Sequence, residues 1–414
     1  MLDIQFIREN RELVQEKARL KSIDVDINVL LDKDETRRAL LKEVEDLRQK
    51  RNELAQKNKG QKPSEDDIQK GKKLREKIDK LEAKLEEVNS EYKEIIGNVP
   101  NVFPDDTPIG GEEANKPVKV RGKAEKKKVA DHLSWAEGKD YLDFERGAKV
   151  AGNKFYYAKG ALVELELACM QLAVNTAIKH GFTPMSVPHL VNETTIDGTG
   201  FSPRGDEDQI YKIEGENLNL IATSEIPITG YHSGEIFDKQ RLPLLYVGIS
   251  PAYRKEAGAY GKHSKGLYRV HQFNKVELYI FCEPEDSAKW HEKLVAIEEE
   301  LCKSLEIPYR VVRIASGDLG APAYKKFDIE YWSPLENKYR ELTSCSNVTD
   351  YQARRLNIRY RRGDEGTDFV HTLNGTAMAF SRTAIALIEN HQDRGGDLKV
   401  PKALRKYMGG KKTI

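Results

Sequence analysis

The sequence predicts an α+β protein, in which a mostly antiparallel β-sheet is flanked by helices and preceded by an antiparallel helical hairpin. Three observations indicate this fold class. Apolar residues recur at heptad spacing between residues 37 and 98, which is typical of a coiled coil. Beyond about residue 118, short β-rich runs outnumber helices. The connections between those runs look too short for repeated parallel crossovers, so antiparallel pairing is expected.

Composition and charge exclude several classes of protein. The 414-residue chain has 68 Lys+Arg against 67 Asp+Glu, so no overall field marks it as a nucleic-acid binder. Its four cysteines form no CxxC pair, which predicts a reduced chain without disulfides or a zinc site. No secretory signal is visible, and no apolar run approaches the ~18 residues that span a bilayer. We therefore expect a cytoplasmic protein without membrane contact.

The first expected element is the coiled-coil hairpin. Two heptad series, from Leu40 to Leu54 and from Leu74 to Ile95, flank a breaker at residues 60–64. Two helices of roughly 25 residues would extend about 40 Å at ~1.5 Å per residue. The distal part is rich in bases, namely Lys50, Arg51, Lys57, Lys59, Lys62, Lys70, Lys72, Lys73 and Arg75. The hairpin is either a dimerisation element or an arm that presents bases to a distant phosphate backbone, and this segment alone leaves both open.

A stretch rich in Pro and Gly at residues 101–117 indicates a linker, which predicts an N-terminal domain at 1–100 and a second domain at 118–414. In the second domain, helices are expected at 161–180, 287–305 and 377–389. Strands are expected at 182–191, 244–249, 265–281, 309–314, 325–332 and 339–346.

The most distinctive chemical groups follow residue 253. Alternate side chains of a strand point the same way, so Arg254 and Glu256 are expected on one face of one strand. A loop rich in Gly and Lys follows, and Arg269 begins the expected returning strand with Phe273 further along. Such a hairpin suits a nucleoside triphosphate, because the guanidinium of Arg254 can form paired hydrogen bonds with phosphate and Phe273 offers a stacking face for a base. An Arg-x-Glu pair alone is more often a surface salt bridge.

Three further clusters fit the same kind of ligand. The segment Ala222 to Glu225 combines hydroxyls with a carboxylate, which suits a small ammonium group. Glu341 and Ser344 could hold a hard cation through oxygen. Arg382 lies in an apolar helix, so its charge needs an anionic partner, either a ligand or a structural glutamate. The P-loop, GxGxxG, HExxH and GxSxG motifs are absent from the sequence.

Along its whole length the sequence resembles bacterial-type seryl-tRNA synthetases, a family of class II aminoacyl-tRNA synthetases. The heptads resemble the N-terminal arm of that family, and the three class II motifs match residues 161–188, 253–277 and 374–382. Stretches that are specific to the seryl branch match Thr223–Ser224–Glu225 and residues 341–347. The latter is followed by Tyr351–Gln352–Ala353–Arg354–Arg355, which also matches.

The resemblance implies ATP-dependent ligation of L-serine to tRNA(Ser) through a seryl-adenylate, with Mg²⁺ and without zinc. It also implies a homodimer whose coiled-coil arm binds the long variable arm of tRNA(Ser), and serylation of tRNA(Sec) where that tRNA exists. The implied catalytic residues are Arg254, Glu341 and Arg382, with Mg²⁺ held through ATP by Glu341 and Ser344.

Further roles follow from the same resemblance. Glu256 faces the adenine amino group and Phe273 stacks on the base. The implied ATP contacts are Arg254, Lys255, Glu256, Val270, Phe273, Glu341, Leu342, Thr343, Ser344 and Arg382. The implied serine contacts are Thr223, Ser224, Glu225, Arg254, Glu277, Asn374 and Thr376, with Glu225 on the ammonium group and Glu277 and Thr376 on the hydroxyl.

Three alternatives stay open at this point. A synthetase-like ligase that charges a carrier protein would share the catalytic half, although the long heptads argue against it. An inactive paralogue that serves as a binding protein would not need the charged positions, all of which are present. A class II enzyme for threonine or proline would be expected to carry a C-terminal anticodon domain, which the sequence does not show.

Overall fold

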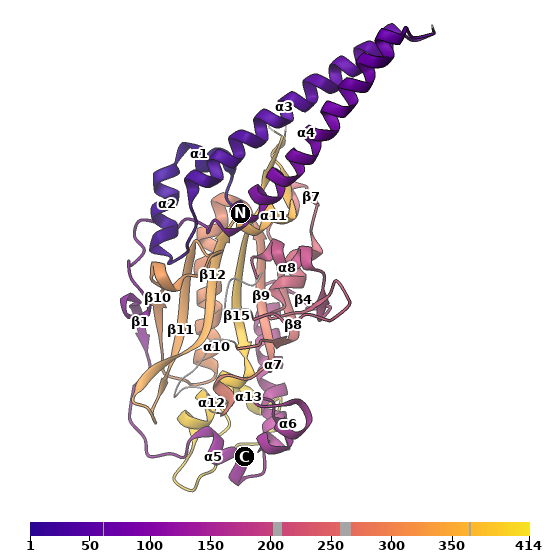
Figure 1. Ribbon diagram of the computed structural model, residues 1–414. Helices are drawn as coiled ribbons and strands as arrows, with labels where there is room; N and C mark the ends of the chain where they lie inside the picture. Colours follow the sequence, from indigo (N-terminus) through magenta and orange to yellow (C-terminus); the bar gives the residue numbers. More distant parts are fainter. Residues whose placement is uncertain (61, 202–208, 257–265, 364–365) are drawn as a thin grey trace. The chain divides into compact units, whose positions relative to one another are not determined.

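The computed structural model describes residues 1–60, 62–201, 209–256, 266–363 and 366–414 (Figure 1). The chain forms two compact units, Met1–Val102 and Phe103–Ile414. Most of the predicted Gly- and Lys-rich loop, at residues 257–265, lies outside the described residues.

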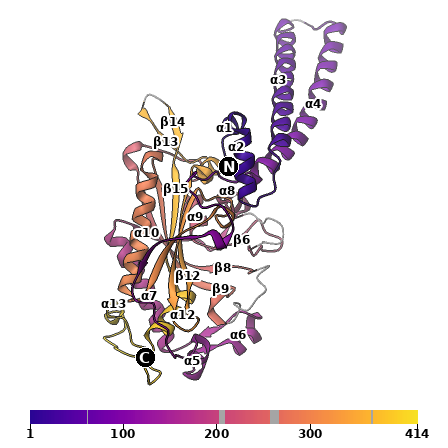
Figure 2. The ribbon, with the colours of Figure 1, turned by 90° about the vertical axis from the view of Figure 1, so that its left-hand side faces the viewer.

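The first unit consists of four helices: α1 (Ile4–Glu9), α2 (Arg11–Leu20), α3 (Ile27–Lys57) and α4 (Glu65–Asn98). Helices α3 and α4 run side by side as the predicted antiparallel hairpin (Figures 1 and 2). They have 31 and 34 residues, longer than expected, because α3 begins well before the heptads, where Asp26 caps its first amides. Five heptad residues are buried along the hairpin: Leu40, Val44, Leu47, Ile78 and Val88.

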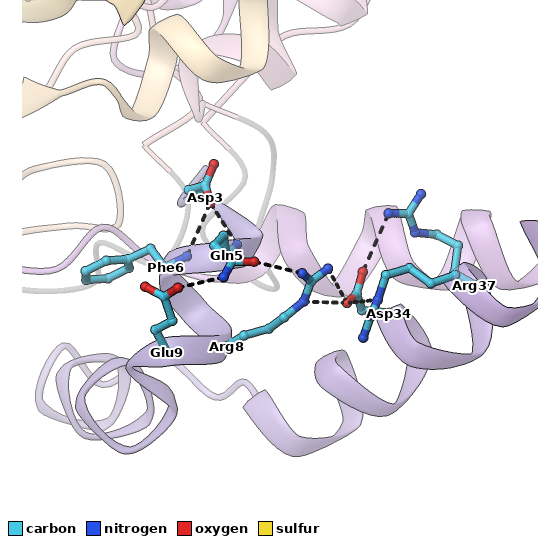
Figure 3. Close-up of polar contacts among 8 residues, drawn as sticks. Asp3, Gln5, Phe6, Arg8, Glu9, Asp34 and Arg37 are labelled. Atoms are coloured by element: carbon cyan, nitrogen blue, oxygen red, sulfur yellow. Dashed lines mark hydrogen bonds and ion pairs between the residues drawn. The ribbon is translucent and has the colours of Figure 1, made fainter. Parts of the chain in front are cut away.

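A buried carboxylate ties the short helix α1 to the hairpin (Figure 3). Asp34 on α3 is fully buried, and three arginines surround it. Its Oδ2 lies 2.7 Å from Nη2 of Arg8 on α1 and 3.1 Å from Nε of Arg38, and its Oδ1 lies 3.5 Å from Nη2 of Arg37. Because a buried carboxylate is tolerated only when it is paired, these contacts fix α1 against α3.

The second unit is built on an eight-stranded sheet with the order β1-β10-β11-β12-β15-β9-β8-β4. All neighbouring strands pair antiparallel except β4 and β8, which pair parallel at one edge. The predicted fold class is therefore confirmed. The strands are β1 (Lys116–Arg121), β4 (Thr183–Ser186), β8 (Leu244–Tyr253), β9 (Gln272–Cys282), β10 (Tyr309–Arg313), β11 (Lys325–Ser333), β12 (Lys338–Thr349) and β15 (His371–Ala379).

Helices cover both faces of this sheet, and the alternation of side chains along β9 separates the two cores (Figure 2). Val276, Leu278 and Ile280 join the core formed with α7 (Ala161–Lys179), α10 (Ser287–Ser304) and α12 (Phe380–His391). Tyr279 and Phe281 join the opposite core, formed with α8 (Glu193–Thr199), α9 (Glu225–Tyr231) and α11 (Tyr351–Leu356). Polar residues at odd positions of β9 therefore share a face with α9 and α11.

The remaining elements are short. The helices are α5 (His132–Gly138), α6 (Phe144–Ala151) and α13 (Lys402–Arg405). The strands are β2 (Leu142–Asp143), β3 (Tyr157–Ala158), β5 (Leu190–Val191), β6 (Asn219–Leu220), β7 (Ile236–Phe237), β13 (Arg359–Arg361) and β14 (Thr367–Phe369). All four cysteines are free and buried.

The sequence predicts no segment that is apolar enough to cross a membrane, but helix α7 is long and apolar enough to do so by length and composition alone. Half of its most apolar window is buried inside the protein. Its buried residues, including Leu162, Leu165 and Cys169, belong to the core beneath the sheet. The core helix of a globular domain has the same composition.

Several predicted boundaries are wrong. Strand β8 ends at Tyr253, and β9 begins only at Gln272, so Arg269 does not start a strand. Residues 377–379 belong to the end of β15 instead of the following helix, because a strand buried on both faces has the same apolar run as a buried helix. The single strand expected at 182–191 is two short strands, β4 and β5, in different sheets.

Candidate active site

One pocket gathers most of the predicted residues on the face of the sheet that carries α9 and α11. It lies between the ends of β8, β9, β12 and β15 and the start of α12, with an empty volume of about 500 Å³ that includes open solvent. It is lined by Arg254, Glu256, Tyr268, Val270, Phe273, Lys275, Glu341, Leu342, Thr343, Ser344, Thr376, Ala379, Ser381 and Arg382.

Two guanidinium groups from distant segments meet in this pocket. Arg254 follows β8, and its Nε donates to the carbonyl of Ala222 over 3.3 Å while its guanidinium lies 5.3 Å from the ring centre of Phe273. Arg382 on α12 lies 5.3 Å from the ring centre of Tyr268. Aromatic faces stabilise both cations without neutralising them. The pocket therefore suits an anion with a flat apolar group.

The two arginines of the pocket differ in their charged neighbours. Nη1 of Arg382 lies 2.7 Å from Oε1 of Glu341. Burial opposes ionisation of Glu341, but the charges of Arg382 and Lys326 outweigh it and hold its pKa at about 2. For Arg254, burial and the charge of Arg382 lower the pKa from its usual value. A ligand with several negative charges would relieve the repulsion between the two arginines.

A bulge in β12 explains why Glu341 and Ser344 share the pocket although an odd number of positions separates them. Ile329 of β11 pairs with Thr343, whereas the next residue, Glu330, pairs with Glu341. Leu342 is therefore an extra residue, and side-chain alternation is shifted by one position there. Both oxygen-bearing side chains consequently line the same pocket.

The start of β9 places a row of functional groups on one face. Phe273, Lys275 and Glu277 occupy alternate positions, so their side chains point the same way. Nζ of Lys275 lies 2.6 Å from Oε2 of Glu277, and both side chains are buried. Thr376 pairs directly with Glu277 across the strands, and its Oγ1 donates to Oε2 over 3.3 Å. Glu277 is thus a buried, paired carboxylate beside the pocket.

A second buried carboxylate, Glu225, lies at the first residue of α9. Burial and the charge of Glu277 raise its pKa to about 7. It accepts hydrogen bonds from Nε2 of Gln352 over 2.8 Å and Nδ2 of Asn374 over 3.1 Å. Helix α9 approaches the sheet closely because Gly248 lies beneath it, where an added Cβ would lie 2.5 Å from Oγ of Ser224. Two carboxylates at this depth suit a ligand with an ammonium group.

Most of the predicted site residues lie in or beside this pocket. Ten line it directly: Arg254, Glu256, Val270, Phe273, Glu341, Leu342, Thr343, Ser344, Thr376 and Arg382. Four more connect to it through hydrogen bonds. Glu277 accepts from Thr376, and Lys275 donates to Oγ1 of Thr223 over 3.2 Å. Thr223 in turn accepts from the backbone amide of Glu225, which is bonded by Asn374. Lys255 and Ser224 do not line the pocket.

The predicted strand geometry of Arg254 and Glu256 is wrong. The chain leaves β8 before Arg254, and Glu256 adopts a φ of 49°. This left-handed conformation is uncommon for a residue with a side chain. It brings Oε2 of Glu256 to 3.1 Å from Nη1 of Arg269. The two residues still reach one pocket, but through a turn instead of a shared strand face.

Sequence reasoning missed four of the residues that line the pocket, namely Tyr268, Lys275, Ala379 and Ser381. Lys275 could have been found, because it lies midway between Phe273 and Glu277 in a strand of period two. Tyr268 lies in a short 3-10 turn, Gly266–Tyr268, for which no periodic pattern exists. Among the described residues, no cluster of three or more His, Cys, Asp or Glu has a geometry that could hold a metal ion.

Comparisons with known proteins agree with this geometry. Residues 1–103 match the family model described as the seryl-tRNA synthetase N-terminal domain, and residues 210–391 match the tRNA synthetase class II core domain (G, H, P, S and T). The chain is 46% identical to the serine–tRNA ligase of Dictyoglomus turgidum, over 99% of this chain and 98% of the relative.

Solved structures are similar over the full length. The seryl-tRNA synthetase from Pyrococcus horikoshii complexed with ATP is 41% identical with a TM-score of 0.90, covering 100% of this chain and 99% of that one. The cytoplasmic serine–tRNA ligase from Naegleria fowleri in complex with AMP is 33% identical with a TM-score of 0.85, covering 100% and 98%. The chain belongs to the seryl-tRNA synthetase family.

Proposed function

We propose that this protein ligates L-serine to tRNA(Ser) in two steps, with ATP first activating serine as seryl-adenylate. One observation carries the proposal: Arg254 and Arg382 converge on a single pocket whose Lys275 contacts the buried carboxylate of Glu277 directly and is linked to the buried Glu225 through Thr223. A polyphosphate would bind at one end of this arrangement and an amino acid at the other. Full-length relatives named serine–tRNA ligase support this reading over a carrier-protein ligase or an inactive paralogue.

Charge neutralisation is the main chemical task of such a site. The serine carboxylate attacks the α-phosphate, and both groups are anionic, so positive charge must be in place before they meet. Arg254 lies between the two ends of the site, because it contacts Ala222 and Phe273. We assign it to the α-phosphate and the serine carboxylate. We assign Arg382 to the outer phosphates, where its ion pair with Glu341 would be exchanged for the ligand.

The nucleoside end follows from the aromatic and apolar lining. Phe273 offers a face for adenine, with Val270 and Leu342 beside it. Glu256 would accept a hydrogen bond from the adenine amino group. Thr343 is held by a hydrogen bond to the buried Glu298, which fixes its backbone at the edge of the pocket.

The amino-acid end recognises the ammonium and hydroxyl groups of serine. Glu225 would hold the ammonium group, with Thr223 and Asn374 beside it. Glu277 and Thr376 would bind the hydroxyl. Buried polar groups that alanine leaves unpaired would disfavour alanine strongly, whereas the extra methyl group of threonine must be rejected by shape.

Glu341 and Ser344 fit a magnesium ion that enters with ATP. They offer a carboxylate and a hydroxyl, both hard oxygen ligands, and the low pKa of Glu341 keeps that carboxylate ionised. Two protein ligands suffice when phosphate oxygens and water complete the shell. When bound, the ion neutralises charge on the phosphates. We propose no zinc requirement.

The coiled-coil hairpin is the proposed tRNA-binding element. Its distal bases Lys50, Arg51, Lys59, Lys72 and Lys73 are exposed. We propose that they contact the phosphates of the long variable arm of tRNA(Ser). In this scheme residues 1–100 form the tRNA-binding domain, 101–117 the linker and 118–414 the catalytic domain of a cytoplasmic homodimer.

Amino-acid-dependent ATP–pyrophosphate exchange tests this function. When all standard amino acids are tested in turn, serine should be the one that supports exchange, and exchange should require Mg²⁺. Added tRNA(Ser) should be charged with serine only. Exchange with another amino acid in place of serine would refute the substrate assignment. Exchange without tRNA charging would favour a carrier-protein ligase instead, and no exchange at all would favour an inactive paralogue.

A further inference from the structure

We propose that Gln352 is a positioning residue for serine: it holds the carboxylate of Glu225 in the orientation that receives the ammonium group. The inference rests on the proposed function, since it concerns how that site selects its substrate. It also gives a role to the conspicuous segment Tyr351–Gln352–Ala353–Arg354–Arg355, which does not line the pocket.

Gln352 lies at the centre of a fully buried hydrogen-bond network. Its side chain has no exposed surface. Nε2 lies 2.8 Å from Oε1 of Glu225 and 3.1 Å from the carbonyl oxygen of Thr199. Oε1 accepts from Oη of Tyr279 over 2.8 Å and from Oγ1 of Thr372 over 2.7 Å. All four hydrogen-bonding positions of the amide are therefore used.

These partners fix which way the amide faces. The carbonyl of Thr199 can only accept, so the nitrogen of the Gln352 amide must lie on that side. The same nitrogen then faces Glu225, to which it can only donate. A donor at this position favours the ionised carboxylate over the protonated one. Only the ionised form of Glu225 would attract an ammonium group.

The short helix that carries Gln352 is itself held firmly against α8. Nη1 of Arg355 donates to the carbonyl of Asp197 over 2.8 Å, and Nη2 donates to Oη of Tyr351 over 2.8 Å. The helices pack so closely that a Cβ at Gly198 would lie 2.3 Å from Cδ2 of Leu356. The position of Gln352 is thus set by the whole α8–α11 contact, which explains why the segment matters although it lies outside the pocket.

The protonation of Glu225 depends on several groups around it. Burial and the charge of Glu277 raise its pKa to about 7, whereas the bond from Gln352 and the charges of Lys275 and Arg254 lower it. Removal of the Gln352 donor should therefore move the titration of Glu225 to higher pH. Serine binding would then be lost over a wider range on the acidic side.

The test compares Gln352→Met, which keeps the length of the side chain but removes the amide, with Gln352→Glu and the wild-type enzyme. Loss of a hydrogen bond to a charged group should raise the serine KM in pyrophosphate exchange by about tenfold to a hundredfold. The ATP KM should stay within about twofold, because Gln352 does not line the nucleotide pocket. The acid limb of serine kcat/KM should move to higher pH, and further for Gln352→Glu, which adds a second carboxyl.

Gln392→Met is a matched control. The Nε2 of this glutamine likewise donates to two acceptors, the carbonyl oxygens of Ala130 and Ile388, neither of which belongs to the site. Its kinetics and pH profile should match the wild type. If Gln352→Met does not fold, Thr372→Val removes one hydroxyl that orients the amide, and it should raise the serine KM about threefold while sparing ATP.

The possible failures are distinguishable. If the wild-type enzyme does not exchange with serine, the proposed function fails. If the wild-type enzyme is active but serine and ATP KM rise equally in the Gln352 variants, Gln352 is merely structural. An unchanged serine KM, or an acid limb that does not move, would likewise overturn the positioning role.

Discussion

Replacement of Glu277 by alanine should reduce recognition of serine while leaving recognition of ATP comparatively intact. The side chain is 2% exposed, and its Oε2 is held by Lys275 at 2.6 Å and by Thr376 at 3.3 Å. If the substrate hydroxyl donates to this carboxylate, Glu277→Ala removes a charged acceptor that serine uses and alanine does not.

The expected size follows from the contact that is lost. A hydrogen bond to a charged group contributes about 1.5–3 kcal/mol, so serine kcat/KM should fall about tenfold to 150-fold. Alanine makes no such bond, and its kcat/KM should change little, so the serine-to-alanine ratio falls by the same factor. The variant also leaves the ammonium of Lys275 buried without its partner, which should cost about 3–5 kcal/mol of folding stability.

Pyrophosphate exchange with serine, alanine and varied ATP measures these quantities, below the melting temperature of the variant. Addition of Lys275→Met to Glu277→Ala should recover stability without recovering serine specificity, which separates the two effects. Equal loss toward serine and ATP, or an unchanged serine-to-alanine ratio, would refute the role of Glu277.

Three further predictions concern the hairpin and the buried carboxylates. Deletion of residues 37–98 should abolish tRNA charging and spare serine-dependent exchange; surviving charging would refute the tRNA-binding role of the hairpin. Glu225→Gln should abolish serine activation yet stabilise the free protein by roughly 3 kcal/mol at pH 8, because a pKa raised from 4.5 to about 7 makes the ionised folded state unfavourable. Most of that gain should be lost as the pH falls to 4.5, the pKa of the carboxyl in the unfolded chain. Denaturant titrations that show the same gain at pH 8 and at pH 4.5 would contradict this cause. Asp34→Asn should lower the free energy of unfolding of the first unit by about 1–2 kcal/mol. This loss is smaller than for a fully buried pair because the arginines around Asp34 remain partly exposed. In the same titration, Arg48→Ala at an exposed pair should cost almost nothing.

Much of the fold follows from periodicity in the sequence. The heptads of the hairpin and the amphipathic pattern of α10 give their elements directly, because each has one buried stripe. Strands β10, β11 and β12 are bounded by clear turn residues and lie within a few positions of their expected limits. The central strand β15 is not predicted, and its last residues, 377–379, are expected in a helix, since burial on both faces removes the alternation that identifies a strand.

The residues of the site are predicted better by the chemistry of their side chains than by the local periodicity of the sequence. The sequence indicates Arg254 as a phosphate contact, Glu341 as a cation ligand and Arg382 as a buried charge that needs a partner, and the structure brings all three to one pocket. The bulge at Leu342 and the left-handed turn at Glu256 depend on long-range pairing, so nothing in their immediate sequence indicates them. Gln352 is polar and fully buried, and only its partners in four other segments reveal its place.

A crystal structure with a non-hydrolysable seryl-adenylate analogue would show whether Arg254 and Glu225 bind one substrate. We expect the guanidinium of Arg254 to contact the acyl-phosphate mimic, Phe273 to stack on adenine, and Glu225 to receive the ammonium group within hydrogen-bond distance. An analogue bound away from Arg254, or with its amino group remote from Glu225, would rule out these assignments.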